Sequence, residues 1–259
     1  MPSILRSVSS RNAVTEGYNA RGMERTKTPP LARLAQAFRD VLYPPRCVAC
    51  GEQGSFLCRA CREAMPRALP PRCPLCWQPE RRGEMCGRCA QARPAFAGAR
   101  SLYVYEGPVR EAVHALKYNH LSALARPMAE VMAAYLEAEA LPVDLVVPVP
   151  LFGRRQRLRG YNQSALLARE LARLGGLPLA ERGLARRRDT PPQARSVDAE
   201  ARRRNVAGAF AADGRRVEGR RVLLIDDVMT TGATLDACAQ ALRQVRAASV
   251  WALTFARED

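Results

Sequence analysis

The sequence predicts an α/β protein: a parallel sheet flanked by helices, with a small cysteine module on its amino-terminal side. Val222 to Ile225 is an apolar run that leads into a polar turn and an amphipathic stretch to about Arg246, the order of a buried strand followed by a helix. Asp144 to Pro150 predicts a second buried strand that runs into a proline-rigid loop. Four C-x-x-C units precede both segments. At 259 residues and 47% hydrophobic, the chain can bury one α/β core plus a small module.

Four segments are expected along the chain. Residues 1–30 have no hydrophobic periodicity and predict a disordered leader, in which Met23 is a plausible alternative start. Residues 31–45 are the next segment, in which we expect an amphipathic helix that ends at about Leu42, before Pro44. The apolar face of this helix either packs on the core or contacts a membrane surface. Residues 46–95 hold the cysteine module, and residues 96–259 hold the α/β domain.

Eight of the nine cysteines form the four C-x-x-C units, which pair thiolates at the spacing of a structural zinc site: Cys47/Cys50, Cys58/Cys61, Cys73/Cys76 and Cys86/Cys89. Disulfides would need an oxidising compartment and an export signal, and neither is indicated. The short spacers inside each half favour sequential pairing into two four-cysteine sites, although interleaved pairing remains open. Cys238 stands alone and is expected to be a buried small hydrophobe.

The segment Val222 to Thr234, V-L-L-I-D-D-V-M-T-T-G-A-T, places two carboxylates and a hydroxyl-rich turn between the predicted strand and helix. Ligands of open α/β sheets bind beyond the carboxyl ends of the strands, where the next helix presents unpaired N–H groups. The Thr-Gly turn suits a phosphate, and the paired carboxylates suit vicinal hydroxyls or a metal carried by the ligand. If the segment served only to end the strand and cap the helix, one Asp or Thr would be enough, whereas several polar residues occur here. The G-x-G-x-x-G and P-loop patterns are both missing from this segment.

These thirteen residues resemble the phosphoribosyl pyrophosphate (PRPP) motif of type I phosphoribosyltransferases. The resemblance implies that Asp226 and Asp227 hold the ribose hydroxyls and that magnesium arrives with PRPP. It also implies that the turn wraps the 5′-phosphate. The PRPP-binding set is then Asp226, Asp227, Val228, Met229, Thr230, Thr231, Gly232, Ala233 and Thr234.

From Cys47 onward the chain resembles the ComF family, which joins a double zinc ribbon to a type I phosphoribosyltransferase-like domain and is associated with DNA uptake in competent bacteria. The matching pieces are H-A-L-K-Y (114–118), P-V-P-L (148–151), R-G-Y-N-Q (159–163), T-P-P-Q-A (190–194) and R-R-x-N-V-x-G-A-F (202–210). The resemblance implies single-stranded DNA and a competence helicase as partners.

A strand near Leu102 to Tyr105 and a helix from Pro108 to Tyr118 should open the α/β domain. Lys117 falls near the end of that helix, where a lysine without a function in binding would be an exposed charge that interacts favourably with the helix dipole. The family resemblance instead implies a place at the PRPP site, so Lys117, Asp226 and Asp227 are the candidate catalytic residues. His114 and His120 are expected to be structural.

The loop after the Asp144–Pro150 strand is followed by a basic stretch. The corresponding loop of type I phosphoribosyltransferases holds pyrophosphate through backbone amides, and the resemblance implies the same here. Arginines suit that charge because guanidinium groups bind phosphate oxygens in pairs. The candidate pyrophosphate residues are Val149, Pro150, Arg154, Arg155, Arg159, Asn162 and Gln163. A second arginine-rich region, residues 186–204, predicts a mobile surface loop, and the resemblance to type I phosphoribosyltransferases implies that this loop closes over the reacting centre.

The net charge of +16 comes disproportionately from the amino-terminal part of the chain. A basic module with Phe56, Trp77 and Phe96 could bind single-stranded DNA, whereas an arginine-rich genome would explain the charge without any partner. No apolar run is long enough to span a bilayer and residues 1–28 lack a signal-peptide core, so a cytoplasmic protein is expected. Two functions remain: PRPP binding in DNA uptake, or catalytic transfer of ribose 5-phosphate from PRPP to an unidentified acceptor with release of pyrophosphate.

Overall fold

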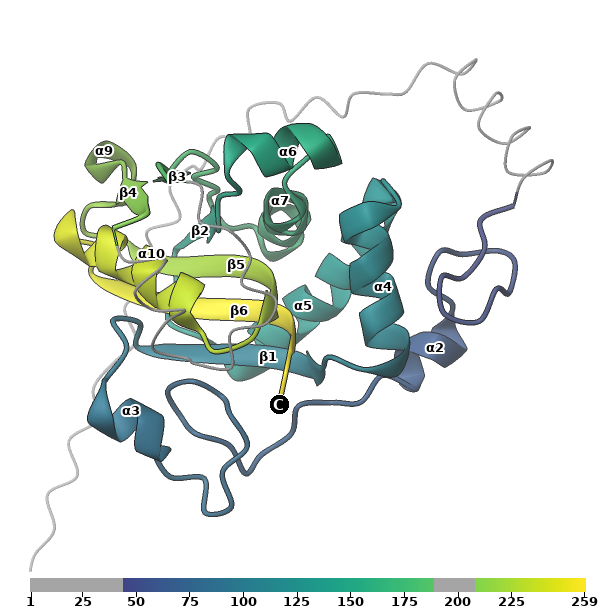
Figure 1. The fold of residues 1–259 in the computed structure, drawn as a ribbon, viewed down its shortest axis with the longest axis horizontal. Coiled ribbons are helices and arrows are strands. Elements are labelled where there is room, and N and C mark those ends of the chain that lie inside the picture. Colours follow the sequence, from purple (N-terminus) through teal and green to yellow (C-terminus); the bar gives the residue numbers. More distant parts are fainter. Residues whose placement is uncertain (1–43, 189–207) are drawn as a thin grey trace, which may run out of the picture. The chain divides into compact units, whose positions relative to one another are not determined.

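A four-stranded parallel sheet forms the centre of the fold in a computed structural model that describes residues 44–188 and 208–259 (Figure 1). The strands are β1 (Gly98–Val104), β2 (Leu145–Pro148), β5 (Arg221–Met229) and β6 (Ser249–Arg257), in the order β1-β6-β5-β2. Val222 pairs with Leu145 on one side and with Val250 on the other. Apolar residues on both sides of β5 are fully buried, as expected for a central parallel strand. The predicted α/β fold class is therefore confirmed.

Helices cover both faces of the sheet. One face carries α4 (Gly107–Tyr118), the short 3₁₀ helix Ser122–Leu124, α5 (Ala125–Glu139) and α7 (Gln163–Gly175), and Leu223 and Ile225 of β5 point into that core. The other face carries α10 (Ala233–Gln244), against which Val222 and Leu224 pack. This alternation follows from the two-residue period of a strand. The predicted helix from Pro108 to Tyr118 corresponds to α4, and β1 begins four residues before the strand expected near Leu102.

Smaller elements complete the described α/β part. Strands β3 (Leu184–Arg186) and β4 (Phe210–Ala212) form an antiparallel pair, and α9 (Gly214–Val217) follows β4. The basic stretch after β2 is a helix, α6 (Gly153–Arg159), rather than part of a loop. Most of the arginine-rich region 186–204 falls outside the described residues, as do the predicted leader and the helix over 31–42.

The cysteine segments pack directly on the sheet's two hydrophobic cores. Helix α2 (Arg59–Glu63) begins after Cys58, and α3 (Gly87–Gln91) begins after Cys86. Cys47, Cys58 and Cys61 belong to the core beneath α4, α5 and α7, whereas the four cysteines from Cys73 to Cys89 belong to the core beneath α10. Within the two described ranges, every helix is too short or too polar to traverse a lipid bilayer.

Candidate functional site

The carboxyl ends of β5 and β2 and the adjoining ends of three helices bring the predicted site residues together. Asp226 and Asp227 lie near the end of β5, and residues 230–232 form the turn that joins β5 to α10. Lys117 comes from the last turn of α4, and Ser164 from the first turn of α7. In a parallel sheet these connections all meet at one edge, so residues far apart in sequence become neighbours.

Lys117 and Asp227 form an ion pair. The Nζ atom of Lys117 lies 3.1 Å from Oδ1 of Asp227, and both side chains are largely buried. Burial works to lower the pKa of Lys117, but attraction to Asp227 and Asp226 outweighs it and raises the pKa, so this lysine stays charged. The second oxygen of Asp227, Oδ2, is buried and has no hydrogen-bond partner. A ligand hydroxyl or a metal ion would supply the missing partner.

The carboxyl group of Asp226 is strongly perturbed. Its Oδ1 accepts hydrogen bonds from the Ser164 hydroxyl at 2.7 Å and from the backbone N–H of Asp227 at 2.9 Å. Burial is the main cause that raises the pKa of Asp226 to about 7, and repulsion from Asp227 is the second. These two causes outweigh the two hydrogen bonds, which lower the pKa. Asp226 is therefore poised to exchange a proton near neutral pH when a cation or a hydroxyl donor approaches.

The turn after β5 is the candidate phosphate site. Gly232 has a φ of +81°, a backbone conformation that strongly favours glycine, and a Cβ atom there would lie 2.7 Å from Cε of Met229, so the end of that side chain would have to shift. The N–H of Ala233 donates to Oγ1 of Thr231 at 3.4 Å, and Thr234 lies in the first turn of α10. The Met229 side chain is buried in the core and is therefore not available to a ligand.

The segment between β2 and α7 differs from the predicted pyrophosphate loop. The N–H of Val149 donates to the carbonyl of Ile225 at 2.9 Å and Pro150 has no N–H, so the predicted backbone amides are not free at these two positions. Asn162 caps α7 by accepting from the N–H of Ser164, and its own amide donates to the carbonyl of Val149. Asn162 thus holds the loop against the helix.

Helix α6 presents arginines beside this loop. Arg154 is exposed and Arg155 is half-buried. Arg159 contacts the adjoining ends of α7 and α4: its guanidinium donates to Oε1 of Gln163 at 3.0 Å and lies 5.0 Å from the ring centre of Tyr118. The two histidines have local contacts, His114 with the Tyr118 ring and His120 with the backbone carbonyl of Arg159.

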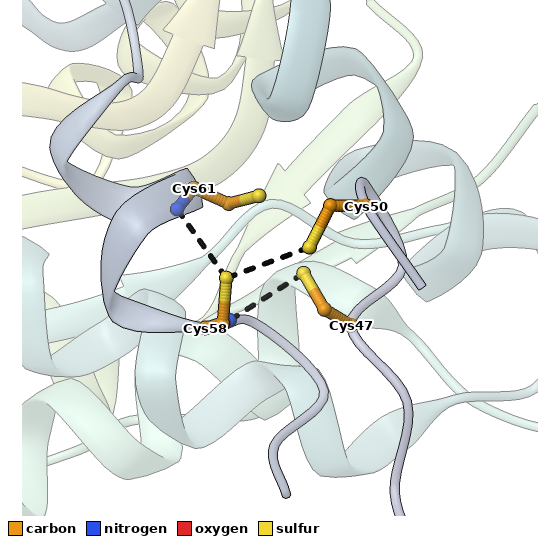
Figure 2. A group of neighbouring side chains, drawn as sticks. All are labelled: Cys47, Cys50, Cys58 and Cys61. Carbon is orange, nitrogen blue, oxygen red and sulfur yellow. Dashed lines mark hydrogen bonds between the residues drawn. The ribbon is translucent and has the colours of Figure 1, made fainter. Parts of the chain in front are cut away.

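The eight C-x-x-C cysteines form two groups of four. The sulfur atoms in each group lie within 4.8 Å of one another, and the grouping is sequential: Cys47, Cys50, Cys58 and Cys61, then Cys73, Cys76, Cys86 and Cys89. Figure 2 shows the first four side chains converging on one point, with Cys50 and Cys58 sulfurs 3.7 Å apart. The favoured pairing is confirmed, and interleaved pairing is excluded.

The donor chemistry of both groups fits a tetrahedral thiolate-bound ion such as Zn²⁺. Burial works against ionisation of Cys47, but backbone N–H donors, first that of Cys58, lower its pKa to about 6. Backbone donors likewise lower the pKa of Cys73 to about 7 in spite of its burial. Both groups therefore contain a thiol that ionises readily, as a metal ligand must. Cys238 is fully buried in α10, as predicted.

Comparisons with known proteins agree with both halves of this geometry. A double zinc ribbon domain model matches residues 38–90, and a phosphoribosyl transferase domain model matches residues 161–258. The chain is 35% identical to DNA utilization protein YhgH of Salmonella typhi over 76% of its length and 89% of the relative's. It is 33% identical to competence protein F of Haemophilus influenzae, over 65% and 77% of the two chains. The chain belongs to the ComF family.

Competence protein ComFC of Bacillus subtilis is a further relative of this ComF-family chain, 29% identical over 78% of its length and 84% of the relative's. Among solved structures, the chain is similar to a glutamine PRPP amidotransferase from B. subtilis. The match spans 51% of this chain and 26% of the amidotransferase chain, with 22% sequence identity and a TM-score of 0.36. The zinc ribbon match and the two four-cysteine groups together support structural zinc in this ComF-family protein.

Sequence reasoning missed two residues of this ComF-family site. Ser164 directly contacts Asp226, and Tyr105, whose pKa burial raises, lies close enough to interact with Lys117. The local signal for Ser164 was available, because Asn162 is a good helix-capping residue and places Ser164 in the first turn of α7. The contact itself depends on how α7 packs against β5, which no local pattern specifies.

Proposed function

We propose that this chain binds PRPP with Mg²⁺ at the carboxyl edge of its sheet and acts in DNA uptake during natural transformation, with single-stranded DNA as a ligand. The observation that carries the proposal is the convergence of Asp226, Asp227 and Lys117 beside the Gly232 turn. The names of the competence relatives support the biological role.

Each part of the site has a distinct role in this proposal. The carboxylates of Asp226 and Asp227 accept hydrogen bonds from the ribose hydroxyls and provide oxygens for Mg²⁺. The N–H groups at the start of α10 and the hydroxyls of Thr230, Thr231 and Thr234 bind the 5′-phosphate. Arg159 and the other arginines of α6 balance the pyrophosphate charge. Lys117 holds Asp227 in place and adds a positive charge.

Calorimetric titration of Mg²⁺ and PRPP into the zinc-loaded protein tests the site. Wild type should bind, and Asp226→Asn/Asp227→Asn should not. Asp144→Asn is the matched control. Asp144 lies just before β2, at the amino ends of the strands and away from the proposed site, and it pairs there with Arg220 and Arg221. Absence of binding by folded wild type, or equal binding by the carboxylate variant, would contradict the proposal.

A second candidate function is catalytic phosphoribosyl transfer. The match to a phosphoribosyl transferase domain and the charged Lys117–Asp227 pair favour it. The bond between ribose C1 and the pyrophosphate oxygen breaks with its electrons leaving on pyrophosphate, while an acceptor nitrogen bonds to C1 and loses a proton. Assay of pyrophosphate release with a nucleobase panel tests this step. Release that persists in Asp226→Asn/Asp227→Asn would not come from this site.

The charge distribution supports the proposed binding of single-stranded DNA. The chain carries a net charge of +16, and α6 contains four arginines and no buried side chain. Phosphate contacts release counterions, so affinity for a fluorescent oligonucleotide should fall steeply as salt rises. It should survive Asp226→Asn/Asp227→Asn. Affinity that does not depend on salt would contradict backbone binding.

The proposed protein partner is a competence helicase, and the proposed location is the cytoplasm. Eight thiols arranged as metal ligands fit a reducing compartment. Fractionation of cells that express the tagged protein tests the location, and co-purification with the helicase tests the partner.

A further inference from the structure

The second cysteine group, Cys73 to Cys89, is connected to the Gly232 turn by two separate sets of contacts. The first runs through the segment after α3. The N–H of Ala95 donates to Oδ1 of Asp236 at 2.7 Å, and the N–H of Asp236 donates to the carbonyl of Gly232 at 2.9 Å. Phe96 is almost fully buried, and its ring tip lies 4.0 Å from the position a Cβ of Gly232 would occupy. The chain leaving Cys89 therefore packs beneath the turn.

The second connection runs through the end of β6. The guanidinium of Arg257 is buried and donates to the carbonyl of Cys76 at 2.7 Å and to Asp259 at 2.6 Å. Arg257 pairs with Met229, the last residue of β5 before the turn, and the N–H of Glu258 donates to the carbonyl of Met229 at 2.9 Å. Asp259 also accepts two bonds from Arg72, at 2.8 Å each. This network joins the Cys73–Cys76 segment to the strand end that precedes the turn.

The first cysteine group has a different position. Cys47, Cys58 and Cys61 pack into the core on the opposite face of the sheet, with α4, α5 and α7. The second group shares its core with Phe96, Met229, Ala233 and Leu235, which surround the turn. The two groups have the same donor set, so each serves as a control for the other.

We propose that the second cysteine group with its metal is a positioning element for the phosphate turn, acting through Phe96, Asp236 and Arg257. The chemical class of the turn's ligand, a phosphate, rests on the proposed function. The turn leaves β5, reverses at a glycine with positive φ and enters α10. Holding both of its ends before the ligand arrives reduces the entropy lost on binding and so increases affinity.

Hydrogen exchange of the turn tests this inference without any ligand. In the zinc-loaded, ligand-free protein, Asp236→Ala removes the acceptor for Ala95 but leaves all eight cysteines. Exchange in the peptide covering residues 230–236 should rise about tenfold, the scale expected for a lost hydrogen bond to a charged carboxylate, and the PRPP dissociation constant should rise by a similar factor. Gln240→Ala is the matched control, because Gln240 donates to Oδ2 of the same carboxylate at 3.1 Å. It should change both quantities less than about twofold. Equal effects of the two variants would overturn the inference.

Removal of one metal site at a time provides the second test. Cys86→Ser/Cys89→Ser should reduce zinc content by one ion and increase exchange in residues 230–236, whereas Cys58→Ser/Cys61→Ser should reduce zinc content equally and leave that exchange unchanged. Equal exchange in the two variants would overturn the inference. If either variant fails to fold, the comparison of Asp236→Ala with Gln240→Ala decides. Failure of folded wild type to bind PRPP would refute the proposed function, whereas the exchange experiment would still decide the positioning role.

Discussion

The Nζ atom of Lys117 lies 3.1 Å from Oδ1 of Asp227, joining the end of α4 to the end of β5. The pair is largely buried, so neither charge is fully solvated. The partnership keeps Lys117 charged and leaves the second Asp227 oxygen without a protein partner. An ion pair with one unsatisfied carboxylate oxygen is suited to receive a ligand.

Lys117→Met should strongly destabilise the protein. Removing the lysine leaves the Asp227 charge buried without its counter-ion, and we expect the free energy of unfolding to fall by about 3 kcal/mol in urea titrations. Arg59→Met is the control, because it breaks the exposed Arg59–Glu63 pair and should cost less than about 1 kcal/mol. Similar losses in the two variants would show that the Lys117–Asp227 pair is not buried in solution.

Asp226 should make stability depend on pH. Its pKa in the folded protein is about 7, above the ordinary value of 3.8, so the folded state binds the proton more tightly than the unfolded state. The resulting stabilisation is complete below about pH 4 and is lost as the pH rises to about 7. Relative to Asp226→Asn, wild type should lose about 2 kcal/mol of unfolding free energy between pH 5 and pH 7.5. Parallel pH profiles for the two proteins would contradict the raised pKa.

Ser164→Ala should raise the pKa of Asp226 further. The Ser164 hydroxyl stabilises the ionised carboxylate, so its loss should move the pH midpoint of PRPP affinity upward and cost about 1 kcal/mol of stability. Ser101→Ala is the control, since Ser101 is buried and shares a 2.7 Å hydroxyl contact with Thr254 inside the sheet. It should lower stability comparably without moving the midpoint. An unchanged midpoint in Ser164→Ala would show that this hydroxyl does not tune Asp226.

Gly232→Ala should impair the turn through two separate costs. The positive φ disfavours alanine, and the new methyl group would lie 2.7 Å from Cε of Met229. Gly176→Ala isolates the first cost, because Gly176 has a φ of +62° and nothing lies within 4 Å of its Cβ position. We expect a loss of about 1 kcal/mol for Gly176→Ala and about 2–4 kcal/mol for Gly232→Ala in unfolding experiments, with PRPP binding lost only in the latter. Equal losses would show that Met229 moves aside at no cost.

Local patterns were sufficient where one segment carries the whole signal. The apolar run from Val222 and the polar turn ending at Thr234 predicted a buried strand, a site at its carboxyl end and a helix, and the structure has this order of strand, turn and helix. The cysteine spacers favoured sequential pairing for a similar reason, because short chains can bring only nearby thiols together. The helical form of the basic stretch after β2 was not predicted.

Long-range contacts were outside the reach of such patterns. The Ser164–Asp226 and Arg257–Cys76 hydrogen bonds each join segments that become neighbours only after the sheet has formed. The placement of the two cysteine groups on opposite faces likewise depends on which core each group packs against.

The sequence by itself determined the α/β class, the metal-ligand chemistry of the cysteines and the place of Asp226 and Asp227 after a buried apolar run, because strand and helix periods and thiol spacing are local properties of the chain. Only the tertiary structure decided that Lys117 pairs with Asp227, that Ser164 contacts Asp226 and that the second cysteine group shares a hydrophobic core with the residues around the Gly232 turn. The physical reason is that the free energy of these contacts depends on distance and burial, which are set when distant segments pack together and not by the order of residues within any one of them.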